Sequence, residues 1–233
     1  YYLAKIGHYL LHDTMPRVNM DFTQDVCYQG LFFLADSLNE GKPSGLKVFG
    51  DWPPIYPALS QLPDAARASW FAFDHYYSDG AFNAALPYVF ANNPTTLYDV
   101  GGNTGKWALR CCKYNENIAV TLLDLPQQIV LAKENIANAG FSDRIDFQAV
   151  DMLSDAPLPG EADIWWMSQF LDCFSPEQII SILSKIASVM KPGAKVCIME
   201  LFWDAQRFEA ASFSLNASSL YFTCMANGNS RFY

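Results

Sequence analysis

The chain has 233 residues, of which 51% are hydrophobic and 17% charged, so it can build a full core and is not globally disordered. Its 15 basic and 24 acidic residues give a net charge of −9 without any basic run, which argues against a nucleic-acid-binding protein and against docking on an anionic membrane. No stretch of about 18 apolar residues occurs, so no membrane span is expected.

The six cysteines show neither a Cys-x-x-Cys pair nor a Cys/His spacing typical of metal ligands. A chain of this length does not need covalent cross-links, so we expect neither disulfides nor a metal site, and we expect a cytoplasmic protein. The sequence starts at Tyr1 rather than at Met. We therefore expect a piece of a longer protein, for which a targeting segment stays an open alternative.

The first part of the chain is expected to be mainly helical, because none of its segments alternates between apolar and polar residues. Asp64 and Asp79 are the expected N-caps of two of these helices. In chain order, we expect a strand end and turn at residues 1–7, a helix over 24–40, an ordered irregular connection over 43–63, and helices over 64–77 and 79–90.

From Pro94 onward, short apolar strands alternate with helical segments. In chain order, we expect strands over 96–100, 118–123, 144–150, 162–167 and 195–200, helices over about 105–114, 126–138 and 176–190, and a last helix over 209–226. Strands that are apolar on both faces are typical of buried parallel sheets. The pattern predicts an α/β fold with a doubly wound, mostly parallel sheet and right-handed crossovers.

Glycines and an acid mark the end of the first strand, at the edge where such sheets bind ligands. Gly101, Gly102 and Gly105 let the backbone turn tightly and approach a ligand closely. Asp99, just ahead of the turn, would repel a phosphate and suits an amino group or an ordered water. The turn lacks the spacing of a dinucleotide fingerprint and of a P-loop, and taken alone it also fits a loop without a ligand.

Acids also end the next two strands. Asp124 can accept hydrogen bonds from both hydroxyls of a ribose. Asp151 can accept from the exocyclic amine of adenine, while Met152 lies against the ring. Each position taken alone also fits a solvated or structural strand end. Together, the three strand ends predict recognition of a nucleoside without a phosphate, which points to S-adenosylmethionine.

Four segments carry a resemblance to a known family. They are residues 97–105 (LYDVGGNTG), 123–126 (LDLP), 146–152 (DFQAVDM) and 190–193 (MKPG). They resemble the S-adenosylmethionine-dependent O-methyltransferases of the caffeate and hydroxyindole type, in which an Asp-Leu-Pro run after the second strand is characteristic. The resemblance is strong over residues 94–233 and weaker over residues 1–93.

This resemblance implies two domains and a homodimer. Residues 94–233 would form a Rossmann-like class I methyltransferase domain, incomplete at its C-terminus, because family members continue further. Residues 1–93 would be the end of a winged-helix dimerisation domain together with connecting helices.

The resemblance also implies S-adenosylmethionine as the cofactor. The glycine turn would hold its methionine tail, Asp124 its ribose with Leu125 alongside, and Asp151 with Met152 its adenine. Ser168 falls where plant members often carry a Lys near the cofactor.

The catalytic positions depart from the family pattern. The family usually has Leu-His-Asp-Trp after the fourth strand, with the His as general base, whereas this chain has Asp172 at that position. Glu200 matches the Glu that usually orients the base, and Ser230 stands in place of a second family Glu. An aspartate is a weak base unless burial or a neighbour such as Glu200 raises its pKa. A substrate-orienting acceptor and a structural helix cap are the alternatives for Asp172.

Other positions fit the core better than a site. His75 could project into an acceptor pocket, with a core or surface histidine as the alternative. Cys111 and Cys112 fit the core. The aromatic pairs could line a pocket for an aromatic substrate, but core packing is expected for most; they are Phe32 and Phe33, Trp165 and Trp166, and Phe202 and Trp203.

We therefore expect a cytoplasmic, homodimeric S-adenosylmethionine-dependent methyltransferase that acts on a hydroxyl of a small aromatic or polyketide-like molecule. Two alternatives stay open. One keeps the fold and cofactor but performs C- or N-methylation, decarboxylation or hydroxylation. The other is a non-catalytic cofactor-binding protein.

Overall fold

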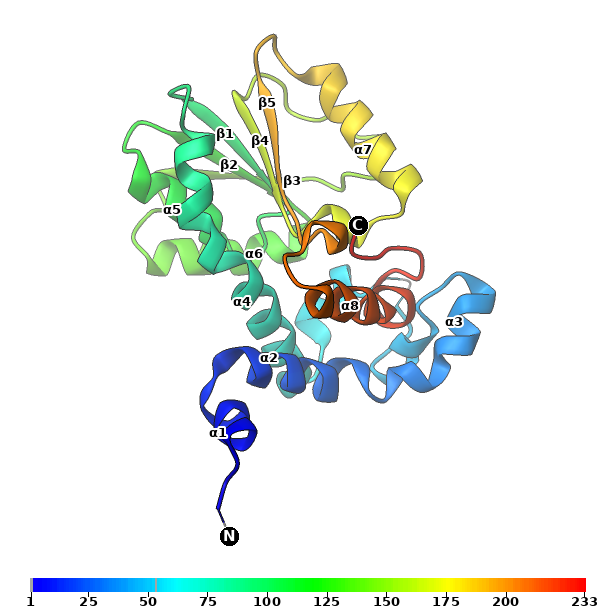
Figure 1. Cartoon of the computed structure of the whole chain (residues 1–233). Helices are drawn as coiled ribbons and strands as arrows, with labels where there is room; N and C mark the ends of the chain where they lie inside the picture. Colours follow the sequence, from blue (N-terminus) through cyan, green and yellow to red (C-terminus); the bar gives the residue numbers. More distant parts are fainter. Residues whose placement is uncertain (1, 53) are drawn as a thin grey trace. The chain divides into compact units, whose positions relative to one another are not determined.

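The computed structural model describes residues 2–52 and 54–233, which form two compact units (Figure 1). One unit comprises the chain up to Ser78 together with Gln206–Arg231, and the other comprises Asp79–Ala205 with Phe232–Tyr233. These units divide the chain after Ser78, whereas the boundary expected before Pro94 rests on composition and family resemblance. That domain boundary stays a prediction.

The regular secondary structure of the first unit is helical in all its described elements. Its elements are α1 (Lys5–His12), α2 (Thr14–Phe22), the π-helix η1 (Thr23–Cys27), the 3-10 helix η2 (Gly30–Phe33), α3 (Leu34–Glu40), the 3-10 helices η3 (Ser44–Val48) and η4 (Tyr56–Gln61), the first part of α4 (Asp64–Val89), α8 (Glu209–Ser218) and the π-helix η7 (Phe222–Ala226). The helical character predicted for this part of the chain is confirmed.

Two predictions near the N-terminus were wrong in detail. Helix α1 replaces the strand end and turn expected at residues 1–7, of which Tyr1 lies outside the described residues. The helix expected over 24–40 is divided into η1, η2 and α3, and it ends at Gly41 (φ +62°) as predicted. A left-handed glycine of this kind is a common helix terminator. The irregular connection over 43–63 contains η3 and η4; Pro53, within it, lies outside the described residues.

The two helices expected over 64–77 and 79–90 are one continuous helix, α4. Ser78 does not interrupt it, because its hydroxyl donates back to the carbonyl oxygen of Asp74 at 3.1 Å, one turn earlier. Asp79 pairs with the ammonium of Lys106 at 2.6 Å. Similarly, the last helix is shorter than expected: α8 ends at Ser218 and is followed by η7.

The second unit contains a five-stranded sheet with the order β3-β2-β1-β4-β5, in which all four strand pairs are parallel. The strands are β1 (Thr96–Val100), β2 (Ala119–Asp124), β3 (Ile145–Ala149), β4 (Ile164–Ser168) and β5 (Lys195–Met199), and the helices of the unit besides the end of α4 are α5 (Lys106–Tyr114), α6 (Pro126–Asn138) and α7 (Pro176–Val189). The predicted doubly wound α/β fold is confirmed. Strand order reverses between β1 and β4, which makes the ends of these strands the point where such sheets bind ligands.

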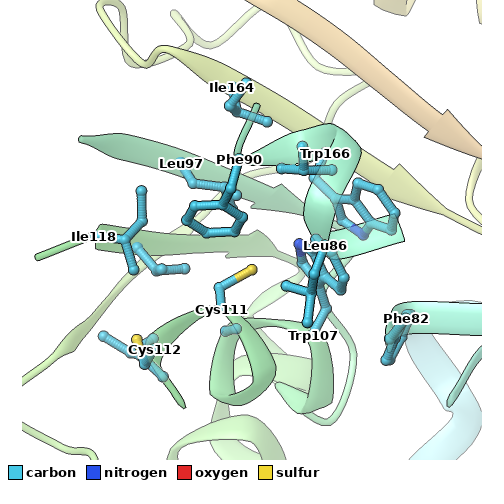
Figure 2. Packing of buried hydrophobic residues seen from close by; sticks show 14 of the residues in the cluster. Phe82, Leu86, Phe90, Leu97, Trp107, Cys111, Cys112, Ile118, Ile164 and Trp166 are labelled. Carbon is cyan, nitrogen blue, oxygen red and sulfur yellow. The ribbon is translucent and has the colours of Figure 1, made fainter. Parts of the chain in front are cut away.

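Both faces of the sheet are covered by helices, as Figure 1 shows for α5 and α7 on opposite sides. On the α5 face, the indole rings of Trp107 and Trp166 stack with their centroids 3.9 Å apart, within a cluster that includes Cys111 and Cys112 (Figure 2). Trp165, the neighbour of Trp166 on β4, packs instead on the α7 face. Successive strand residues point to opposite faces, so adjacent tryptophans serve two cores.

The core placement expected for Cys111, Cys112 and the Trp165–Trp166 pair is therefore confirmed. The other aromatic pairs behave differently, because Phe32, Phe202 and Trp203 are exposed. An isolated exposed aromatic side chain is ordinary for a protein surface.

Candidate active site

The backbone turn after β1 depends on glycine at three positions. Gly101 has φ +68°, and a Cβ atom there would lie 2.2 Å from the ring of Phe170. Gly105 has φ +79° and precedes the first turn of α5, where a Cβ would approach Ile136 at 2.7 Å. A Cβ on Gly102 would lie 2.6 Å from Leu122. The turn is thus compressed between strand, helix and neighbouring loop, and only glycine fits all three positions.

Asp124, at the end of β2, holds this turn in place. Its Oδ2 accepts a hydrogen bond from the backbone N–H of Asn103 at 2.8 Å, and its Oδ1 accepts from the N–H of Leu125 at 2.7 Å. Burial raises the pKa of Asp124 to about 6, although both hydrogen bonds act in the opposite direction. The carboxylate therefore joins two neighbouring strand ends in addition to any contact with a ligand.

Asp99 lies beneath the same turn and is only 2% exposed. Its Oδ2 has no hydrogen-bond partner among the described residues, and it lies 2.8 Å from where a Cβ on Gly102 would be. Burial, followed by the nearby charge of Asp124, raises the pKa of Asp99 to about 7, and a backbone hydrogen bond at Ala108 opposes this shift. A buried carboxyl with an unused acceptor is uncommon in proteins and indicates a functional role.

The remaining residues predicted to bind a cofactor differ in exposure. Asp151 is exposed, and its Oδ1 accepts from the N–H of Leu153 at 2.9 Å, which closes a short turn after β3. Met152 is buried in the core cluster on the α7 face. The Ser168 hydroxyl, at the end of β4, is buried and has no hydrogen-bond partner among the described residues. Their roles toward a cofactor stay predictions.

Glu200, directly after β5, holds the loop that follows β4. Its Oε1 accepts from the backbone N–H of Phe170 at 2.9 Å and from that of Leu171 at 2.8 Å. The preceding residue, Gln169, has φ +46°, a strained value for a residue with a side chain. Glu200 thus fixes the backbone immediately before Asp172.

Asp172 lies in a short 3-10 helix, η5 (Leu171–Cys173), and is 5% exposed. The thiol of Cys173 donates to its Oδ1 at 3.5 Å. One alternative for Asp172, a cap of α7, is wrong, because Ser175 is the N-cap and forms a capping box with Gln178. The interpretations as a base and as a substrate-orienting acceptor stay open.

Two further candidates belong to the first unit. The Nδ1 of His75 lies 3.9 Å from a carboxylate oxygen of Asp74, and its ring stacks on Phe71. Ser230, at the place of the second family Glu, is buried. Two parts of the site escaped sequence reasoning: Phe170, which packs against Gly101, and the strained Gln169. Neither has a sequence signal, because both depend on how two loops meet.

No group of three or more His, Cys, Asp or Glu side chains within the described part of the chain could hold a metal ion. In residues 2–52 and 54–233, no helix is both long enough and apolar enough to cross a bilayer.

Comparisons with known proteins relate the chain to methyltransferases. A family model described as an O-methyltransferase domain matches residues 82–232. The L-tyrosine C(3)-methyltransferase of Streptomyces lavendulae is 27% identical over 178 residues, which are 76% of this chain and 48% of that protein. The 3-hydroxy-5-methyl-1-naphthoate 3-O-methyltransferase of Streptomyces sahachiroi is 34% identical over 123 residues, which are 52% of this chain and 35% of that protein. The chain therefore spans half or less of the length of these relatives.

Among solved structures, an O-methyltransferase from neocarzinostatin biosynthesis has a similar fold. It superposes with a TM-score of 0.68 at 20% identity, over 98% of this chain and 64% of that one. That protein was crystallised with S-adenosylmethionine and 2-hydroxy-5-methyl naphthoic acid. The superposition supports the class I methyltransferase architecture expected from the sequence.

The two hydrogen bonds that Glu200 accepts from the backbone of Phe170 and Leu171 can be tested by substitution. We expect Glu200→Ala to speed hydrogen exchange at the amides of Phe170 and Leu171 and to lower the free energy of unfolding by about 1–3 kcal/mol, because two part-buried N–H groups lose their acceptor. Glu200→Gln should restore much of the protection, since its amide oxygen can still accept. Glu134→Ala, on the exposed face of α6, is the control. Unchanged exchange at both amides in Glu200→Ala would show that the hydrogen bonds to Glu200 are not needed to hold this loop.

Proposed function

This chain belongs to the O-methyltransferase domain family, and from that premise we propose that the protein transfers the methyl group of S-adenosylmethionine to a hydroxyl of a small aromatic or polyketide-like molecule. The observation that carries the proposal is the turn of Gly101, Gly102 and Gly105, joined to Asp124 at the switch point of the sheet. All of these residues lie inside the segment that matches the family.

The residues at this edge fit S-adenosylmethionine chemically. The cofactor combines ribose, adenine and a zwitterionic amino acid tail, and it supplies a methyl group on a positively charged sulfur. Asp99 Oδ2 and Ser168 Oγ are buried polar atoms without a hydrogen-bond partner among the described residues, so both have capacity for a ligand. The edge offers carboxylates from Asp99 and Asp124, which favour a cation over a phosphate.

We assign the parts of the cofactor as follows. The glycine turn would hold the methionine tail, and Asp124 would bind the ribose with Leu125 beside it. Ser168 would contact a polar atom of the cofactor near the methionine tail. Asp151 is exposed, so its carboxylate can accept a hydrogen bond from the adenine amine. Met152, which is mostly buried in the core, would supply an apolar contact to the adenine. The related proteins named above, two of them acting on or crystallised with naphthoates, support an aromatic acceptor.

We propose Asp172 as the catalytic base. S-adenosylmethionine, when bound, would supply an electrophilic methyl group, so that a C–O bond would form as the C–S bond breaks, and Asp172 would take the proton of the acceptor hydroxyl. A phenol with pKa about 10 must lose this proton during attack, and a buried aspartate is a stronger base than an exposed one. Glu200 is a positioning residue, because it holds the backbone ahead of Asp172.

A second candidate function is C-methylation. It is favoured by the similarity to a tyrosine C(3)-methyltransferase, which covers 76% of this chain. Removal of the phenol proton also makes the ring carbon beside the oxygen nucleophilic, so the same base serves both reactions. The position of the methyl group in the product, read by NMR, distinguishes the two.

We also propose a cytoplasmic homodimer without nucleic-acid or membrane partners. All six cysteines are free, which suits a reducing compartment. The net charge of −9 disfavours polyanionic partners. Helix α1 buries none of its residues and leaves Ile6 70% and Leu11 67% exposed, which suits a surface covered by a second copy.

The cofactor assignment predicts specific binding of S-adenosylhomocysteine, measured by calorimetry, with little binding of NAD or ATP. Asp124→Ala should weaken the affinity about 10- to 100-fold, equivalent to about 1.5–3 kcal/mol for a lost hydrogen bond to a charged group. The loss includes loosening of the turn at Asn103. Asp143→Ala removes an exposed carboxylate elsewhere and is the matched control. An unchanged affinity in Asp124→Ala would remove Asp124 from the site.

The role of Asp172 predicts a loss of turnover without a loss of cofactor. Asp172→Asn keeps the shape and removes the base, so kcat should fall about 10²- to 10⁴-fold, while the affinity for S-adenosylhomocysteine barely changes. Asp172→His tests the residue usual in the family and should retain activity. The acceptor in this test is one that the unsubstituted enzyme methylates. If Asp172→Asn methylated it at the wild-type rate, Asp172 would not be the base.

The proposed assembly predicts a dimer in sedimentation velocity experiments on the protein at micromolar concentration. Replacement of Ile6 and Leu11 by Ser should shift the equilibrium toward monomer, because it removes apolar area from the exposed face of α1. Replacement of the exposed Val130 on α6 by Ser is the control. A monomer in the unsubstituted protein would contradict the proposal.

A further inference from the structure

The thiol of Cys173 lies against the carboxylate of Asp172. Its sulfur is 3.5 Å from Oδ1 of Asp172, a distance at which an S–H group can donate a hydrogen bond to oxygen. The two residues are neighbours in the 3-10 helix η5, and neighbouring side chains of a helical turn do not normally face each other. The contact therefore requires both side chains to turn toward the same side of the loop.

A second acceptor competes for the proton of this thiol. The carbonyl oxygen of Gln169 lies 3.9 Å from the sulfur of Cys173. A thiol has one hydrogen, so the two acceptors cannot both hold it fully. The carboxylate oxygen of Asp172 is nearer and carries charge, and a charged acceptor forms the stronger hydrogen bond. We therefore expect the thiol to donate mainly to Asp172.

The backbone that carries both side chains is held at its two ends. At the start, Glu200 accepts a hydrogen bond from the N–H of Phe170 at 2.9 Å. At the end, the hydroxyl of Tyr233 donates to the carbonyl oxygen of Phe174. The freedom that is left to Asp172 is rotation within its own side chain. The last torsion of an aspartate is broad, so a fixed backbone alone does not decide where the carboxylate oxygens point.

We propose that Cys173 is a positioning residue. Its thiol holds Oδ1 and thereby fixes the rotation of the Asp172 carboxylate, so that the other oxygen, Oδ2, takes up the proton of the acceptor hydroxyl. The inference rests on the proposed function, because it assumes that Asp172 is the base. The thiol proton stays on sulfur throughout, since a thiolate beside the carboxylate would place two negative charges together.

A thiol suits this task because it is a weak donor. A backbone N–H or a guanidinium in the same place would also fix the carboxylate, but a strong donor stabilises the ionised form and so weakens the base. The thiol of Cys173 orients Asp172 and leaves most of its basicity. Orientation of the reacting groups contributes much of the rate of such a transfer, so a misdirected base lowers kcat.

Infrared spectroscopy tests the hydrogen bond without cofactor or acceptor. Few other protein groups absorb where S–H bonds stretch, and the difference between the spectra of the unsubstituted protein and Cys173→Ser isolates the band of Cys173. In Asp172→Asn this band should move to higher frequency, because an amide oxygen is a weaker acceptor than a carboxylate. A band that stays in place in Asp172→Asn would overturn the proposal.

Kinetics test the positioning role. The acceptor is whichever of catechol, salicylate and 2-naphthol the unsubstituted enzyme methylates fastest; if it methylates none of the three, the infrared measurement decides alone. Cys173→Ala should lower kcat about 5- to 10-fold, the worth of one hydrogen bond, while KM and the affinity for S-adenosylhomocysteine stay unchanged. Cys173→Ser should stay within about threefold of the wild-type kcat, since its hydroxyl can also donate. Cys197→Ala removes a partly exposed thiol from β5 and is the matched control.

A double-mutant cycle separates positioning from a merely structural role. In the Asp172→Asn background, Cys173→Ala should change kcat by less than about twofold, because no base remains to be oriented. Equal losses in both backgrounds would overturn the proposal. If Asp172→Asn lowered kcat while Cys173→Ala kept the wild-type value, this inference would fail alone. If Asp172→Asn kept the wild-type kcat, the proposed base would fail and this inference with it.

Discussion

The hydrogen bond from the backbone N–H of Asn103 to the carboxylate of Asp124 is the interaction on which the candidate site depends. The turn after β1 has two positive-φ glycines and a positive φ at Asn103 itself, so it has little conformational preference of its own. A fixed acceptor on the adjacent strand decides its path. Asp124 also lies near Asp99, and its charge adds to burial in raising the pKa of Asp99.

The other side of the switch point repeats this arrangement. Glu200 follows β5 and accepts from the backbone after β4, just as Asp124 ends β2 and accepts from the backbone after β1. In both cases the strand next to β1 or β4, on the side away from the switch point, supplies the carboxylate that binds the loop of its neighbour. The two loops then meet where Phe170 packs on Gly101. The loops after β1 and β4 are thus each held by a carboxylate from a neighbouring strand.

Sequence patterns predicted the elements of the second unit closely, whereas in the first unit they predicted the helical character but not the bounds of the helices. Strands such as Thr96–Val100 are buried on both faces, so their apolar runs are unambiguous. In the first unit, the apolar pattern of residues 24–40 suits one helix, but the structure divides this stretch into η1, η2 and α3. Asp79 has the residue type of a helix cap, yet it lies inside the continuous α4 and pairs with Lys106.

The sequence by itself determined the α/β class, the strand ends that carry Asp99, Asp124 and Asp151, and the family, because these depend on residue type and short spacing. Only the tertiary structure decided which acids are exposed and which are buried. Asp151 faces solvent and Asp99 does not, although both lie at the C-terminal end of an apolar strand region. Burial depends on what covers a strand end, here the glycine turn and α5, and that arises from contacts between segments that local patterns do not encode.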